Sequence, residues 1–110
     1  MIIMRQISQD LSDDEIKLIG ECLRATAEGS FFPDWEFQTL LGVDRATVSR
    51  VSENWPHVTI DLDEFACAVI GSLNNLVNYP HGKREELRKY LTFEVDDIPR
   101  ALDRLVELGL

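Results

Sequence analysis

The residues whose side chains could hold a metal ion are few and widely spaced along the chain. The soft ligands are Cys22, His57, Cys67 and His81. None of them forms the close pair that lets one turn present two ligands to a zinc ion. The sequence therefore predicts no metal site. We expect His57 and His81 to lie in loops or at helix ends.

Carboxylates could also do chemistry, because they bind magnesium and exchange protons. They gather at three points, which are Asp13-Asp14, Asp61-Asp63-Glu64 and Asp96-Asp97. Each group lies where a helix is expected to begin, and the helix dipole favours negative charge there. The chain also has no glycine-rich phosphate loop, no serine-nucleophile motif and no recognisable Cys-His order. We therefore expect no catalytic residues, no cofactor and no enzymatic activity.

The net charge of the chain favours a basic protein as partner over nucleic acid or anionic lipid. The 110 residues contain 11 Lys and Arg against 20 Asp and Glu, which gives a net charge of -9. Such a field repels nucleic acid and anionic lipid and attracts basic proteins. When the chain is divided after residues 30, 60 and 80, none of the four segments is net basic.

Length and composition predict a single globular domain over residues 1–110, since 45% of the residues are hydrophobic and the chain has no room for a second core. The N-terminus lacks the apolar core of a signal peptide, and no apolar run approaches the ~20 residues of a membrane helix. We expect a cytoplasmic protein without a membrane partner. In that compartment Cys22 and Cys67 are expected to be reduced and buried.

Caps and apolar spacing predict the elements that position these residues. Ser12 and Glu15 form a capping box in front of a helix from about Asp13 to Glu28, which Gly29 ends. Further helices are expected over residues 34–41, 45–54, 63–78 and 83–91, and from Asp96 or Asp97 to Gly109. The fold class is therefore all-α, a single compact bundle of five or six helices. A minor two-stranded β element, formed by residues 58–62 and 91–95, is the alternative.

Two features of this pattern predict how the bundle packs. Phe31, Phe32, Trp35 and Phe37 are expected to form the heart of the core, because aromatic side chains bury the largest area per residue. One side of the helix over residues 63–78 is small and rich in amides. That side would let a second helix approach closely, which favours a central position for this helix. The residues on this side of the helix are Cys67, Gly71, Asn74, Asn75 and Asn78.

The segment from Phe37 to Val51 resembles the helix-turn-helix of bacterial repressors. Gly42 would make the turn before a recognition helix with the sequence Arg-Ala-Thr-Val-Ser-Arg-Val. Gln38 departs from the motif, which has a small residue at that position, and the flanks are poor in the cations that phosphate binding needs. The resemblance implies a transcription regulator whose DNA contacts would be Arg45, Thr47, Ser49 and Arg50.

A second resemblance covers roughly residues 31–82. This part of the chain is similar to a group of small bacterial proteins of unestablished function, and the resemblance implies no catalytic residues. The short sequence segments that match are Trp35-Glu36-Phe37, Gly42-Val43, Trp55-Pro56, Leu73-Asn74-Asn75 and Tyr79-Pro80-His81-Gly82.

These observations give two hypotheses for the function. The leading one is a non-enzymatic acidic domain that binds a basic protein, for example as an immunity protein or antitoxin that inhibits a basic bacterial toxin. A homodimer is also compatible with the apolar and small-residue helix faces. The second hypothesis is the DNA-binding regulator, and only there would nucleic acid be a partner. The candidate contacts of the leading hypothesis are Asp61, Asp63, Glu64, Asp96 and Asp97.

Overall fold

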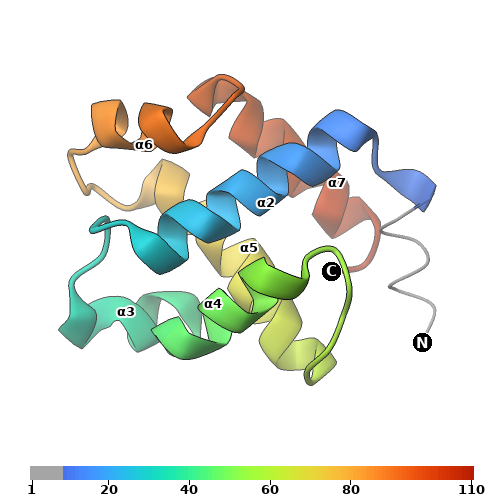
Figure 1. Cartoon of the computed structure of the whole chain (residues 1–110), viewed down its shortest axis with the longest axis horizontal. Coiled ribbons are helices and arrows are strands. Elements are labelled where there is room, and N and C mark those ends of the chain that lie inside the picture. The colour runs from blue at the N-terminus through green and yellow to red at the C-terminus, as the bar shows by residue number, and fades with distance from the viewer. Residues whose placement is uncertain (1–8) are drawn as a thin grey trace.

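Residues 9–110 are described by a computed structural model, in which short loops join six α-helices around one hydrophobic core (Figure 1). A 3-10 turn, η1, precedes the last helix. The elements are α2 (Asp13–Glu28), α3 (Asp34–Leu41), α4 (Arg45–Asn54), α5 (Leu62–Asn78), α6 (Arg84–Tyr90), η1 (Val95–Asp97) and α7 (Ile98–Glu107). The all-α prediction is confirmed, and the first three of these helices have the predicted bounds.

Local side-chain caps explain where α2, α4 and α5 begin. The Ser12 hydroxyl accepts a hydrogen bond from the Glu15 N–H at 3.1 Å, and the Glu15 carboxylate accepts one from the Ser12 N–H at 2.8 Å. Asp44 caps α4 by accepting a bond from the Thr47 N–H at 2.9 Å. Asp61 caps α5 in the same way. These bonds satisfy N–H groups that have no partner inside the helix.

The two-stranded β element, the alternative to a purely helical bundle, is absent from the part of the chain that the structure describes. Residues 58–60 form a loop that leads into the Asp61 cap, and residues 91–94 connect α6 to η1. The backbone N–H of Thr92 donates to the Glu21 carboxylate of α2 at 2.9 Å, and the Thr92 hydroxyl donates to the same carboxylate at 2.6 Å. The contact with Glu21 therefore uses the Thr92 N–H, a donor that pairing between two strands would need.

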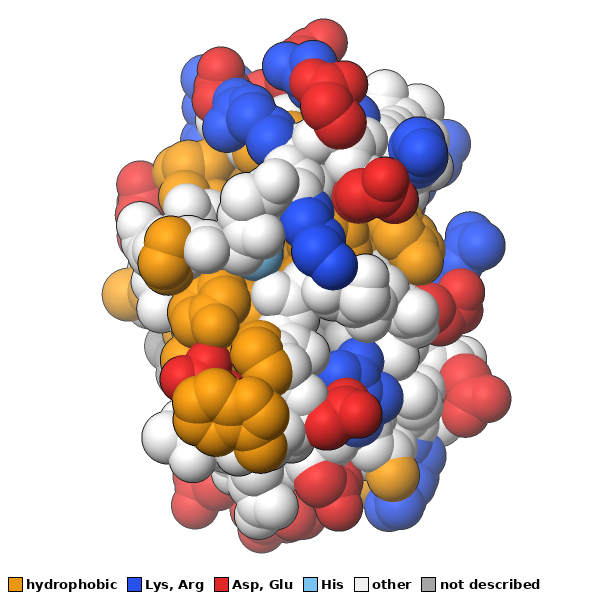
Figure 2. Space-filling model, turned by 90° about the vertical axis from the view of Figure 1, so that its left-hand side faces the viewer, with side chains coloured by type: hydrophobic (Ala, Val, Ile, Leu, Met, Phe, Trp, Pro, Cys, Tyr) orange, Lys and Arg blue, Asp and Glu red, His pale blue; other side chains and the backbone are white. Residues whose placement is uncertain are grey.

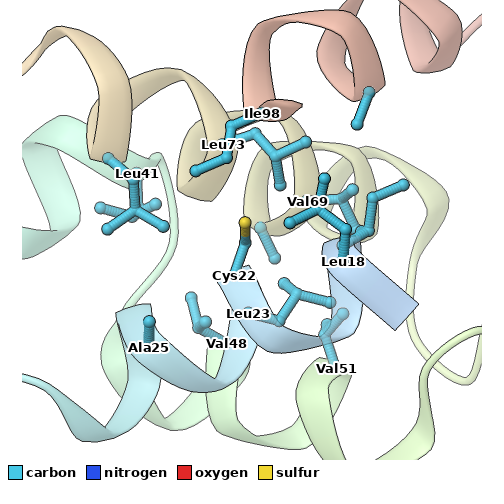
Figure 3. Close-up of a cluster of buried hydrophobic side chains, with 14 of the residues drawn as sticks. Leu18, Cys22, Leu23, Ala25, Leu41, Val48, Val51, Val69, Leu73 and Ile98 are labelled. Carbon is cyan, nitrogen blue, oxygen red and sulfur yellow. The ribbon is translucent and has the colours of Figure 1, made fainter. Parts of the chain in front are cut away.

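The core lies where α2 and α5 meet, with α4 and α7 packed against them (Figure 3). Cys22 is buried at its centre, and desolvation raises the pKa of its thiol far above the ordinary value. Cys67 is exposed, so the prediction of two buried thiols is wrong for that residue, although neither cysteine forms a disulfide. Figure 3 shows the surrounding side chains from four helices, including Leu18, Leu23, Val48, Val51, Val69, Leu73 and Ile98.

Part of the small and amide-rich side of α5, namely Gly71 and Asn75, packs against the end of α3, whereas Cys67, Asn74 and Asn78 are exposed. A methyl group on Gly71 would lie 3.0 Å from Cδ1 of Leu41 and 3.1 Å from its carbonyl oxygen. The Asn75 amide donates to the Leu40 carbonyl oxygen at 3.0 Å and to the Gly71 carbonyl oxygen at 2.8 Å. Because Gly71 has no side chain, the two helices can approach closely, and the hydrogen bond of the buried Asn75 amide joins them.

Candidate functional site

The aromatic cluster divides between the core and the surface. Phe31, Phe32 and Phe37 are buried, whereas Trp35 is 81% exposed. Its predicted place in the core is wrong for a geometric reason. In α3, Phe37 and Leu41 lie one turn apart and face the core, and Trp35, two residues before Phe37, lies about 200° around the helix from it. An exposed tryptophan is a feature of binding surfaces.

Trp35 belongs to a larger apolar surface, which we call the aromatic face and define by Pro33, Trp35, Tyr79 and Pro80. Trp35 and Pro80 are exposed, and Pro33 and Tyr79 are half-buried. Figure 2 shows hydrophobic side chains gathered on this side of the molecule. An open hollow of about 600 Å³ lies beside them, and Pro33, Tyr79 and Pro80 are part of its wall.

A hydrogen bond joins the two parts of the aromatic face. The Tyr79 hydroxyl donates to Oε2 of Glu36 at 2.7 Å, which ties the end of α5 to α3. This bond to a carboxylate raises the pKa of Tyr79, because the neutral phenol is the form that donates. The Tyr79 ring also packs edge-on against the Phe32 ring, with the ring centroids 5.5 Å apart. The face is therefore held in shape by polar and apolar contacts.

His81 closes the turn after α5, which agrees with its predicted position near a helix end. Its Nδ1 accepts a hydrogen bond from the Lys83 N–H at 2.9 Å, so that nitrogen carries a lone pair. The other ring nitrogen, Nε2, therefore bears the proton and donates to the Leu76 carbonyl oxygen at 2.9 Å. His57 lies exposed in the loop after α4. Within residues 9–110, no three His, Cys, Asp or Glu side chains gather as metal ligands would.

The Arg45 side chain is partly buried, with 31% of its surface exposed, and it folds back against the ends of neighbouring elements. Its guanidinium donates to the carbonyl oxygens of Thr26 at 3.1 Å and Phe32 at 3.3 Å, and to Oδ1 of Asp34 at 3.0 Å. It also lies 4.3 Å from the centre of the Phe37 ring. Arg45 therefore joins the end of α2 to the start of α3. Sequence reasoning missed this role, because the motif suggested a DNA contact.

The remaining residues of the suggested recognition helix do not form a basic surface. The Thr47 hydroxyl donates to Asp44 at 2.6 Å, and this bond lowers the pKa of that carboxyl. Ser49 is half-buried, and Arg50 alone among the four candidate DNA contacts is exposed. The turn itself has the expected form, since Gly42 has a φ of 81°, a conformation that favours glycine.

The acidic residues at the start of α5 form one exposed group, the α5 acidic end, defined as Asp61, Asp63 and Glu64. Asp61 uses its carboxylate as the helix cap, accepting from the Asp63 N–H at 3.0 Å. No Lys, Arg or His among residues 9–110 forms an ion pair with any of the three. Among the described residues, the group is therefore exposed to solvent without an ion-pair partner.

The other two predicted contacts lie elsewhere and are already engaged. Asp96 forms an ion pair with Arg84 at 2.9 Å, and Asp97 accepts a hydrogen bond from the Glu94 N–H at 3.1 Å. Asp96 shares the wall of a small pocket with Leu76, at the C-terminal end of α5.

The two acidic groups therefore lie near opposite ends of α5. With 17 residues, this helix is about 25 Å long. In Figure 1, α5 begins at the lower edge of the molecule and α7 begins at the upper edge. The structure does not bring the five carboxylates together.

None of the helices in residues 9–110 combines the length and the apolar character that crossing a membrane requires. Comparisons with protein-family models, with curated proteins and with solved structures found no match to this chain.

Proposed function

We propose that this chain is a non-enzymatic binding domain whose α5 acidic end docks a basic protein. The observation that supports it is the uneven pairing of charge. Most cations of residues 9–110 already pair with a carboxylate, namely Arg24, Arg45, Arg84, Arg88, Lys89 and Arg104. Within residues 9–110, the three neighbouring carboxylates of the α5 acidic end have no such partner, so they present a local group of unpaired negative charge to solvent.

An unpaired acidic surface of this kind favours fast association with a basic partner. Long-range attraction raises the association rate, and its effect falls as salt screens the charges. A basic toxin domain is one such partner, and binding would inhibit it where the acidic end covers its cationic substrate site. Asp96 is not part of this surface, because it lies near the opposite end of α5 and pairs with Arg84 at 2.9 Å. For the alternative function, a DNA-binding regulator, Arg50 is the one exposed residue among the four candidate DNA contacts.

The experiment is an affinity capture from lysate with the tagged protein, at about 50 mM and 500 mM salt. Nuclease-treated and untreated samples are run in parallel. We expect one stoichiometric basic protein that survives nuclease and weakens at high salt. The double variant Asp63→Asn/Glu64→Gln should reduce capture by about tenfold, since two rim charges are lost while the Asp61 cap stays.

The matched control is Asp13→Asn/Asp14→Asn, which removes the same charge from the exposed first turn of α2. It should capture the partner as well as the wild type does. Equal loss with both variants would mean that only the net charge matters, which contradicts a specific α5 site. Recovery of DNA that disappears after nuclease treatment would overturn the proposal in favour of the regulator.

A further inference from the structure

We propose that residues 1–8 of this chain cover an apolar groove between α2 and α7, with the side chains of Ile2 and Ile3 against Phe93. Residues 1–8 precede the part of the chain that the structure describes. The groove shares no residue with the α5 acidic end, so this proposal does not depend on the basic partner proposed above.

The groove lies where the first half of α2 meets the loop before η1 and the first half of α7. It has a volume of about 460 Å³, whereas one water molecule occupies roughly 30 Å³, so it has room for several side chains. Its apolar lining comes from Leu18 of α2, Phe93 of the loop and Ala101 of α7. Leu18 and Ala101 are buried, and Phe93 is half-buried. Apolar side chains that cover such a lining are removed from water, which stabilises the covered state.

The described part of the chain begins beside this groove. Ser12 lines it, and the carbonyl oxygen of Asp10 accepts a hydrogen bond from Arg104 of α7 at 2.6 Å. The stretch of α2 that lines the groove, from Ser12 to Leu18, is about 9 Å long. Eight residues in an extended conformation span about 26 Å. Residues 1–8 are therefore long enough to fold back along the whole groove.

The sequence of residues 1–8 suits an apolar groove. Their apolar side chains outnumber the polar ones, and a single charged residue, Arg5, interrupts them. Side chains of this kind are usually removed from water in folded proteins. The apolar members are Met1, Ile2, Ile3, Met4 and Ile7.

The charges around the groove complement the charge of this segment. Asp14, Glu15 and Asp97 line the groove together with one cation, Arg100, so the lining carries an excess of negative charge. Arg5 brings the opposite charge to it. An acidic segment would be repelled by the same lining.

The covalent connection favours this segment over a separate protein as the occupant. A segment that is attached next to its binding site is present there at an effective concentration in the millimolar range, about 1 mM for a short connection. Only three residues separate residue 8 from Ser12, which lines the groove. Even weak apolar contacts are then enough to keep the groove covered.

The first test is nuclear magnetic resonance of the 110-residue chain with 13C-labelled isoleucine methyl groups. We expect nuclear Overhauser contacts from the Ile2 or Ile3 methyl groups to the Phe93 ring. The ring current of Phe93 should also displace these methyl signals, and Phe93→Leu should remove that displacement. Because the contacts are measured in the wild-type chain, the result does not depend on the folding of a variant.

The second test is the double variant Ile2→Asp/Ile3→Asp, which places two carboxylates beside the acidic lining of the groove. The segment should leave the groove, the amide resonances of Phe93 and Ala101 should shift, and the melting temperature should fall by about 5 °C. The matched control is Gln6→Asp/Ser8→Asp. It adds the same charge to the same segment at polar positions, so both changes should be clearly smaller.

Three results would overturn the proposal. The first is the absence of contacts between Ile2 or Ile3 and Phe93 in the wild-type chain. The second is an equal effect of the two double variants, which would show that added charge, and not the loss of apolar side chains, causes the changes. The third is a contact found only between labelled and unlabelled copies in a mixed sample, which would place the segment in the groove of a second copy.

Discussion

The indole Nε1 of Trp55 donates a hydrogen bond to the carbonyl oxygen of Ile16 at 2.8 Å, which joins the end of α4 to α2. The same ring stacks on Phe65, with centroids 6.0 Å apart and planes 17° apart. Gly20 lies against the indole, and a methyl group there would approach Trp55 Cδ1 to 3.1 Å. Trp55 therefore acts as a wedge among three helices.

Trp55→Phe should lower the free energy of unfolding by about 1–3 kcal/mol, because it removes the hydrogen bond and part of the buried ring. Urea denaturation followed by circular dichroism measures the change. Trp35→Phe is the control, since that indole is 81% exposed, and it should alter stability by less than about 0.5 kcal/mol. Equal effects at the two positions would contradict the structural role given to Trp55.

Gly71→Ala should destabilise the protein, although alanine is the better helix former by about 1 kcal/mol. The new methyl group would press on the Leu41 carbonyl oxygen at 3.1 Å, and backbone moves less easily than a side chain. We expect a net loss of about 1–2 kcal/mol. Gly20→Ala is the matched control. Its methyl group meets only the Trp55 ring, so its cost should be smaller, and the reverse order in thermal unfolding would refute the explanation.

The helices could be predicted because their signals are local. Ser12 and Asp44 cap helices by bonds to residues three positions away, and these helices begin where predicted. The sequence misplaces Trp35 in α3 and Cys67 in α5 because the burial of each depends on which face of its helix meets the neighbouring helices. That orientation is a tertiary property.

The candidate site was harder to predict than the helices for the same reason. The bonds of Arg45 reach residues 11 to 19 positions earlier in the chain. The alternative strand over residues 91–95 does not form, and the Thr92 N–H bonds instead to Glu21, 71 positions away. No periodicity in the sequence carries such information.

Arg45→Ala should reduce the free energy of unfolding by about 2–3 kcal/mol, because it leaves several backbone carbonyl oxygens without a donor. Arg45→Lys should restore only part of the loss, since an ammonium group cannot reproduce the planar fork. Arg50→Ala, on the exposed side of α4, should stay within about 0.5 kcal/mol of the wild type. If Arg45→Ala folds as stably as Arg50→Ala, the guanidinium is not a structural link.

Asp44→Asn should make the protein less sensitive to acid. The hydrogen bonds from the Thr47 hydroxyl and N–H hold the pKa of Asp44 below its ordinary value, so the ionised cap favours the folded state. This contribution is fully present above the unfolded pKa of about 3.9 and is lost as the pH falls through the lower folded pKa. Asparagine caps a helix without a charge, so it keeps the bond geometry while removing this titration. Melting temperatures measured from about pH 5 to pH 3 should therefore fall less steeply for Asp44→Asn than for the wild type. Parallel curves would show that the Asp44 cap does not contribute to acid unfolding.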